Sequence, residues 1–222
     1  MRRAGPAALI AIGVTALVPA CGNPPAAADS NVWPGSQTPI DCCSTTRLSS
    51  PDGSKTLIFQ PDADERAHVR LSAGWLRQYG ITVLEGPASA SWGPDAKSFF
   101  ISDGEGSGQT STFRLFRVPN DGDPIEIDAA QTAVVAAYRA HAGCSVEAAD
   151  PEVWGLGWSP DGARALVLVQ SSIHDPCGQS DEYMVMAVAV DDGSLLAQYD
   201  TPEAARRFAD LIPANVLGVT DP

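Results

Sequence analysis

The chain has three histidines, His68, His141 and His174, which are the side chains best suited to acid–base or metal chemistry near neutral pH. No two of them have the spacing that lets one helix present a pair of zinc ligands. The Gly-Ser-Gly sequence at 106–108 also lacks the pattern of a nucleophile elbow. We therefore predict no catalytic residue, no metal ligand and no cofactor, although a site assembled only by folding stays open.

Acidic residues gather in the polar segments between apolar runs: Asp103, Glu105, Asp121, Asp123, Asp181 and Glu182. Oxygen-rich loops of this kind can hold Ca²⁺, but the EF-hand spacing is absent. Turn formers on an acidic protein explain these residues more simply. The glycine-rich segment Gly104–Gly108 is flanked by predicted strands rather than by a helix. We therefore interpret it as a flexible hairpin loop and not as a phosphate-binding loop.

The elements that would position these loops are indicated by a repeated turn. Gly157–Gly162 has the sequence G-W-S-P-D-G and is followed by the apolar run Ala165–Val169. Proline, aspartate and glycine suit successive positions of a tight turn. A continuous, partly β-branched run is typical of a strand covered on both faces. Altered copies stand at Ser91–Ala96 and at Ser49–Gly53, and the latter lacks the tryptophan.

The similarity between the copies extends past the turn, through a strand, a hairpin loop and a second strand. In the two fuller copies an Asp-Gly turn and a third strand follow. This pattern resembles the TolB-type β-propeller repeat, in which a W-S-P-D-G turn opens each blade, and it covers roughly residues 46 to 200. The resemblance implies an all-β fold of propeller-like antiparallel sheets from three repeat units. That would be an incomplete propeller, because propellers have about four to eight blades; another β-sandwich or barrel is the alternative.

A binding face is expected on the hairpin loops, because successive propeller-like units place these loops on the same edge and recognition concentrates on loops held by a rigid scaffold. The loops are 61–66, 102–111 and 170–182. The candidate binding residues in them are Asp103, Glu105, His174, Asp175 and Asp181.

Two helices are expected outside the repeated pattern. Residues 129–143 are rich in good helix formers and are predicted to form a helix of roughly three turns, inserted in a propeller-like domain that spans 41–200. In the segment 201–222, Thr201 suits an N-cap and Pro202 the first helical position. We therefore predict a C-terminal helix followed by a tail.

The N-terminal segment predicts export. Residues 1–20 contain a basic pair and then an apolar run of about twelve residues, which suits a signal peptide and is too short to span a membrane. The small residues before Cys21 resemble the lipobox of bacterial lipoproteins, in which this cysteine carries lipid. Cleavage after Ala20 or Ala28 without lipid is the alternative. Residues 21–40 are rich in Pro, Ala and Gly and are predicted to form a flexible tether.

Lipidation of one of the five cysteines would leave an even number, which suits an exported protein. The remaining four, Cys42, Cys43, Cys144 and Cys177, admit three pairings. A bridge between the adjacent Cys42 and Cys43 would be strained, so we favour a bridge from each of them to one of the other two. A zinc site is the alternative, but the adjacent pair lacks the C-x-x-C spacing.

The formal charge is −13, and removal of residues 1–20 would make it two units more negative. This balance argues against nucleic acid and anionic lipid head groups as partners, because both require patches of Lys and Arg. We expect a lipid-anchored protein of the bacterial cell envelope that faces the periplasm or the surface; a secreted or soluble periplasmic protein is the alternative. Its domain would bind or scaffold a protein or glycan partner. Other candidate roles are an accessory subunit, a hydrolase-related envelope enzyme with an unrecognised site, and a purely structural orphan domain.

Overall fold

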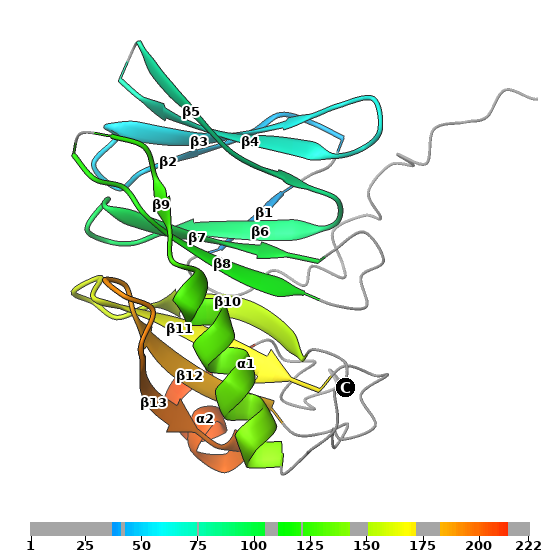
Figure 1. The fold of residues 1–222 in the computed structure, drawn as a ribbon, viewed down its shortest axis with the longest axis vertical. Coiled ribbons are helices and arrows are strands. Elements are labelled where there is room, and N and C mark those ends of the chain that lie inside the picture. Colours follow the sequence, from blue (N-terminus) through cyan, green and yellow to red (C-terminus); the bar gives the residue numbers. More distant parts are fainter. Residues whose placement is uncertain are drawn as a thin grey trace, which may run out of the picture. The chain divides into compact units, whose positions relative to one another are not determined.

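The computed structural model describes residues 37–40, 43–74, 76–104, 111–120, 122–142, 151–171 and 183–212. They form three antiparallel β-sheets and two helices (Figure 1). The first sheet contains β2 (Thr46–Ser49), β3 (Lys55–Pro61), β4 (Ala67–Ala73) and β5 (Arg77–Leu84). The second contains β1 (Thr38–Ile40), β6 (Ala88–Trp92), β7 (Ser98–Asp103), β8 (Thr112–Arg117) and β9 (Ile125–Glu126). The third contains β10 (Glu152–Trp158), β11 (Arg164–Gln170), β12 (Tyr183–Ala189) and β13 (Leu195–Tyr199).

Each sheet is an up-and-down meander in which strands that are adjacent in the sequence pair with each other. The one addition is β1, which pairs antiparallel with β6 and so joins the second sheet. The helices are α1 (Asp128–Ala142) and α2 (Thr201–Phe208). The prediction of a mostly β protein with one inserted helix and one C-terminal helix is therefore confirmed.

The three copies of the repeated turn occupy equivalent places. Pro51 lies between β2 and β3, Pro94 between β6 and β7, and Pro160 between β10 and β11. The turn therefore joins the first two strands of each meander, β1 apart, whereas it was predicted to open the unit. The leading strands escape prediction because they are short or contain residues of low β propensity, such as Gly155 and Gly157.

Local hydrogen bonds explain why the same turn forms each time. In the first copy, Oδ1 of Asp52 accepts from the hydroxyl of Ser50 at 2.6 Å and from the backbone N–H of Ser54 at 3.0 Å. In the third copy, Asp161 accepts in the same way from the hydroxyl two residues earlier and the N–H two residues later. The residue that follows the aspartate has positive φ in all three copies, +70° at Gly53, +57° at Ala96 and +71° at Gly162, and glycine adopts this region most readily.

The second sheet lies between the other two and has a hydrophobic core on both faces. Phe99 packs with Leu57 and Phe59 of the first sheet. The next residue, Phe100, points to the opposite side and packs with Val167 of the third sheet. Strand β7 is buried along its whole length. The run Ala165–Val169, which was predicted to be a strand covered on both faces, lies in β11 and is likewise buried apart from the half-buried Leu166.

The tryptophan of each turn motif bonds to the preceding sheet. Trp92, at the end of β6, donates from Nε1 to the carbonyl of Leu48 at 3.0 Å. Trp158, at the end of β10, donates from Nε1 to the hydroxyl of Ser91 at 3.0 Å. Leu48 and Ser91 each stand one residue before the tryptophan position of their own copy, so the two contacts are made at equivalent positions, although one acceptor is a backbone carbonyl and the other a hydroxyl. The first copy has Ser49 at that position, and its sheet follows no earlier sheet in the described residues.

The free edge of β10 bonds to residues in and next to the strands of the second sheet, including the backbone carbonyl of Ser111. The backbone N–H of Val153 donates to the hydroxyl of Ser111 at 2.8 Å, and that of Gly155 donates to the hydroxyl of Ser102 at 2.9 Å. The carbonyl of Gly155 accepts from the side-chain amide of Gln37. These bonds fix the position of the third sheet against the second.

Helix α1 packs on the core between the second and third sheets through Ala130, Val134 and Tyr138, which are all buried. It has 15 residues, or about four turns, and its ends lie one residue before those of the predicted segment 129–143. These three residues recur four positions apart, which places them on one helix face.

Helix α2 covers the other face of the third sheet and contributes the buried Ala204. Its N-cap is Asp200, whose side chain accepts from the backbone N–H of Glu203 at 3.0 Å. The assignment of Thr201 as the N-cap was therefore wrong. The Thr201 hydroxyl donates instead to the carbonyl of Tyr183 at 2.7 Å, because the helix start lies against β12.

The end of the predicted tether, residues 21–40, is part of the folded domain. Residues Thr38–Ile40 form β1, and the side chain of Ile40 is buried in the core between the first two sheets. The hydroxyl of Ser89 donates to Gln37, which extends the anchoring by one residue. Among the residues that the structure describes, no helix is long and apolar enough to cross a membrane.

Candidate binding edge

The hairpin-loop face predicted from the sequence falls largely outside the described residues. Of the five candidate binding residues, the structure describes Asp103, which ends β7 and has only 9% of its surface exposed. The remaining candidates, Glu105, His174, Asp175 and Asp181, lie outside the described residues, as do Cys21, Cys42, Cys144 and Cys177. Cys43 is described and lies shortly before β2. Because its possible partners lie outside the described residues, the cysteine pairing stays a prediction.

The described hairpin loop of the first sheet, 61–66, is organised by one carboxylate. Asp62 accepts from the backbone N–H of Arg66 at 3.0 Å and from that of Asp64 at 2.9 Å. Its Oδ2 lies 2.9 Å from Nε2 of His68. The N–H of Arg66, together with the His68 contact, holds the pKa of Asp62 well below its usual range. This carboxylate therefore stabilises the loop itself.

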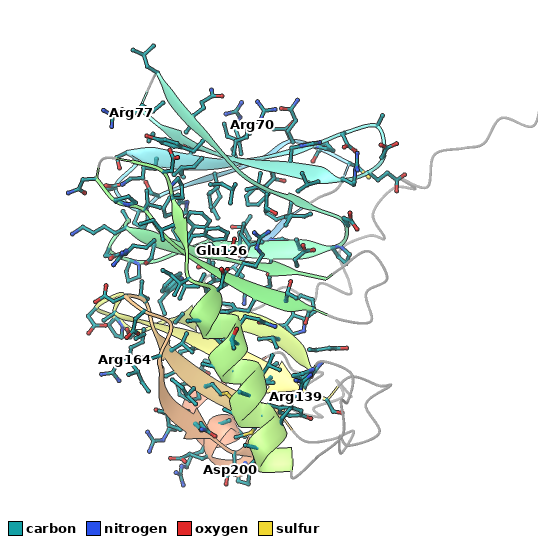
Figure 2. All side chains as sticks on the ribbon, viewed as in Figure 1. Arg70, Arg77, Glu126, Arg139, Arg164 and Asp200 are labelled. Carbon is teal, nitrogen blue, oxygen red and sulfur yellow. The ribbon has the colours of Figure 1, made fainter. Side chains whose placement is uncertain are left out.

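The opposite edge of the sheets carries the repeated turns and is described far more completely. We call it the turn edge, and it lies at the left of Figure 1. Figure 2 shows Arg77 of the first sheet and Arg164 of the third on this same side. The turn edge comprises residues 50–55, Gly74, Leu76, Arg77, 93–97, 117–120, 159–164 and 190–194.

Contacts between successive turns make this edge continuous across the three sheets. Nζ of Lys55 in the first sheet donates to the carbonyl of Ala96 in the second at 3.1 Å. The guanidinium of Arg117 in the second sheet lies 3.7 Å from a carboxylate oxygen of Asp191 in the third. Both bridges join residues that are far apart in the sequence, so the edge exists only in the folded protein.

A first hollow of about 410 Å³ lies where the turns of the first sheet meet the second. We call it the Lys55 hollow. Its lining residues are Ser54, Lys55, Ala73, Gly74, Leu76, Arg77 and Asn120. They include two cations and no carboxylate. Leu76 has 74% of its surface exposed, which is the highest exposure among the large hydrophobic side chains of the described residues.

A second hollow of about 230 Å³, the Lys97 hollow, lies between the turns of the second and third sheets. Its lining residues are Asp95, Lys97, Arg117, Val118, Pro119, Asn120, Val190 and Asp191. Two cations and two carboxylates face each other here, and Arg117 lies near Asp191 as noted above. The charge of this hollow is therefore balanced by its own lining residues.

The aspartates of the repeated turns accept hydrogen bonds from within their own turns. The hydroxyl of Ser50, followed by the N–H of Ser54, lowers the pKa of Asp52 from 3.8 to about 2. The hydroxyl of Ser159 lowers the pKa of Asp161 for the same reason. Both residues are exposed, yet their carboxylate oxygens already accept several hydrogen bonds. These carboxylates therefore stabilise the turns themselves.

Sequence reasoning did not single out Lys55, Arg77 or Asn120, because they come from three separate turns. A local signal was nevertheless present. In each copy of the repeated turn, a basic residue follows the Pro-Asp pair within three positions of the aspartate, as Lys55, Lys97 and Arg164. The repeat therefore carries a recurrent cation as well as a recurrent turn.

The described residues contain no group of three or more His, Cys, Asp or Glu side chains that is arranged to hold a metal ion. Comparison with known proteins gives no family model that matches this chain, and no curated protein whose sequence matches it. The turn edge is therefore interpreted from its own geometry.

Proposed function

We propose that this chain is a lipid-anchored protein of the bacterial cell envelope, whose β domain binds a partner through its turn edge. The observation that carries the proposal is the pair of hollows in which turns from successive sheets converge. Binding sites are commonly hollows of about 300–1,000 Å³ with a few convergent polar groups, and the Lys55 hollow falls in this range.

The rigidity of the sheets that hold the turns favours a binding role. The turns belong to sheets that are joined by the Trp92 and Trp158 bonds and by two buried cores. A turn held in this way loses little conformational entropy when a partner binds. The equivalence of the turn positions also supports the proposal that the three sheets are propeller-type units.

The proposed location in the cell envelope is inferred from the N-terminal sequence. A signal-like segment followed by Cys21 supports export and lipidation, and the segment between Cys21 and β1 would set the distance from the membrane. Replacement of Cys21 by Ser should remove a metabolically incorporated, clickable fatty acid and release the protein from the membrane fraction. Unchanged fatty-acid labelling of this variant would contradict the anchor.

Photo-crosslinking in cells tests the binding role. A photoreactive amino acid at Leu76 should yield adducts with a discrete partner, because this side chain lies at the Lys55 hollow. The matched control is the same substitution at Leu196 on β13, which is 51% exposed and lies outside both hollows. Equal labelling from both positions, or no adduct from Leu76, would contradict a partner at the turn edge and favour the purely structural role.

A further inference from the structure

The first sheet has one face that points away from the second sheet, and we call it the outer face. Leu57 and Phe59 of β3 pack in the core between the two sheets, so the side chains that alternate with them point outward. The register of β2, β3 and β4 places Arg47, Thr56, Ile58, Gln60, His68 and Arg70 on the outer face. None of these six residues is buried, and Figure 2 shows Arg70 on the outer side of the sheet.

The repeat indicates what this face would contain if another sheet of the same kind covered it. Thr56 stands five positions after the proline of its turn. The residues at the same distance in the other two copies are Phe99 and Ala165, and both are fully buried against the preceding sheet. Arg47 likewise pairs with Ile58 at the place where the buried Ala90 pairs with Ile101 in the second sheet. The outer face is therefore not suited to a further sheet of this repeat.

The charge of the outer face has the opposite sign to the charge of the chain. Strands β2 to β5 contain no Asp or Glu, although the chain has 27 acidic residues against 14 basic ones. A polar end face keeps a stack of repeated units soluble, but solubility does not require cations on an acidic protein. The exposed cations of this face, Arg47 and Arg70, are therefore a feature that solubility alone does not explain.

Neither arginine is neutralised by a carboxylate of the described residues. Arg70 donates to the side-chain oxygen of Gln60 at 2.6 Å, which is an uncharged partner. The guanidinium of Arg47 has no hydrogen bond or ion pair with any side chain that the structure describes. The carboxylate of Asp62, in the loop at one end of the face, already contacts Arg66 and His68. Two guanidinium groups of the outer face are thus available to an anionic partner.

The two arginines stand in one row across the sheet. Ile58 pairs with Arg47 on one side and with Arg70 on the other. Because neighbouring strands lie about 4.8 Å apart, the backbones of the two arginines are separated by about 10 Å, with Ile58 between them. A guanidinium can bind both oxygens of a carboxylate. The row therefore matches two carboxylates that flank an aliphatic side chain.

Arg114 of the second sheet shows how an arginine at this position of the repeat is used. It pairs with Ile101 as Arg70 pairs with Ile58, and both isoleucines stand seven positions after the proline of their turn. Arg114 donates to both carboxylate oxygens of Glu126 at 2.6 Å and also to the hydroxyl of Thr82 in the preceding sheet. An arginine at this position thus binds a carboxylate and the neighbour on the same face.

The number of cations favours a protein as the partner. Attraction to a membrane surface typically uses clusters of four to eight Lys or Arg residues, and nucleic acid is bound through several phosphate contacts. Two arginines on either side of an isoleucine are too few for such polyanions. They suit the smaller number of charges in one patch of a protein surface.

We propose that the outer face of the first sheet binds an acidic patch of a partner protein, in which two carboxylates pair with Arg47 and Arg70 and an aliphatic side chain covers Ile58. This inference goes beyond the proposed function, because it adds a second contact surface to the turn edge.

The first experiment measures binding of a fluorescent peptide, in which one Leu stands between two Glu residues, to the purified full chain by fluorescence anisotropy. The same peptide with Gln in place of both Glu residues should bind at least tenfold more weakly, although the net charge of the chain repels the Glu peptide. Equal binding of the two peptides, or no binding of the Glu peptide, overturns the proposal.

Variants then locate the site. Arg70→Gln should weaken binding of the Glu peptide by about fivefold, and the double variant with Arg47→Gln by about tenfold or more. The matched control is Arg164→Gln, which removes the same charge from an exposed turn of the third sheet and should change the affinity by less than about twofold. Both arginines of the outer face are exposed, so unchanged thermal midpoints should verify folding. Equal losses in the variants and the control overturn the assignment.

Two other occupants of the outer face are tested directly. An oligogalacturonate of matched charge should compete with the Glu peptide only weakly, and stronger binding of this glycan overturns the protein partner. A dimer of the full chain in sedimentation that Arg70→Gln abolishes would assign the face to a second copy and would also overturn the proposal.

Photo-crosslinking in cells separates this inference from the proposed function. A photoreactive amino acid at Ser49, which is exposed on β2, should give a discrete adduct that is lost in the Arg47→Gln, Arg70→Gln background. An adduct from Leu76 without one from Ser49 overturns this inference and leaves the turn edge as the binding surface. An adduct from Ser49 alone supports the outer face and contradicts the turn edge.

Discussion

Replacement of Gly155 by alanine should destabilise the protein strongly, because a ring of the adjacent sheet fills the space where Cβ would stand. An ideal Cβ on Gly155 lies 2.7 Å from Cζ of Phe100 and closer still to two other carbons of the ring. Ordinary carbon–carbon contacts are about 3.5–4.0 Å. The strand or the ring must therefore move by about 1 Å or more.

Neither the ring of Phe100 nor strand β10 can move easily. Phe100 is fully buried, its ring stacks on that of Trp158 with centroids 5.2 Å apart, and the ring of Phe113 lies 5.5 Å away. On the strand, the N–H of Gly155 donates to Ser102 and its carbonyl accepts from Gln37. Overpacking of a fixed core costs about 1–3 kcal/mol and occasionally more. We expect about 3 kcal/mol for Gly155→Ala, which lowers the melting temperature by about 6–12 °C in a domain of this size.

Urea unfolding of the full chain measures this loss. The matched control is Gly80→Ala in β5, where an added Cβ meets no atom within 4 Å and where the stability should change by less than about 0.5 kcal/mol. Phe100→Leu in the Gly155→Ala background should relieve the clash, so that the double variant loses about 1–3 kcal/mol less than the sum of the two single losses. Additive losses, or a Gly155→Ala loss no larger than that of the control, would refute the close approach of β10 to the second sheet.

Three further predictions concern the repeated turns and the bond between the second and third sheets. Gly53→Ala should cost about 1 kcal/mol in urea unfolding, because φ is +70° although an added Cβ meets no atom within 4 Å; an unchanged midpoint would contradict the turn geometry. Ser91→Ala should cost about 1–2 kcal/mol by removing the acceptor of the Trp158 indole N–H, and no loss would show that this bond does not join the sheets. The lowered pKa of Asp52 contributes stability above the unfolded-state pKa near 3.8, and this contribution is lost as the pH falls through about 2. Asp52→Asn should therefore lose less stability than the wild type between pH 4 and pH 2, and identical pH profiles would exclude this contribution.

The turns and the strands that follow them were predictable from the sequence. The Pro-Asp-Gly turn is closed by hydrogen bonds between residues no more than five positions apart, such as those between Ser50 and Lys55. The buried run after each turn shows its character in its composition, as at Ala165–Val169. Helix α1 was predicted for the same reason, since its apolar face follows from the spacing of Ala130, Val134 and Tyr138.

The strands that precede the turns were not predictable in this way. Strand β6, with the sequence A-S-A-S-W, has little intrinsic preference for a strand, yet all its residues are buried by the neighbouring strands and sheets. Strand β1 is similar, because its three residues gain a partner only when β6 is in place. Tertiary contacts decided the conformation of both segments.

In the candidate site, too, some features follow from the local sequence and others from tertiary contacts. The sequence by itself determined the repeated turn and the aspartate that accepts hydrogen bonds within it, because these bonds join residues only a few positions apart. It also placed a basic residue after each turn. Only the tertiary structure brought Lys55, Arg77 and Asn120 to one hollow, since these residues are separated by up to 65 positions and meet through the packing of two sheets. The order of that packing depends on contacts such as Trp92 with Leu48 and Gly155 with Phe100, and contacts between distant residues leave no local signature in a single sequence.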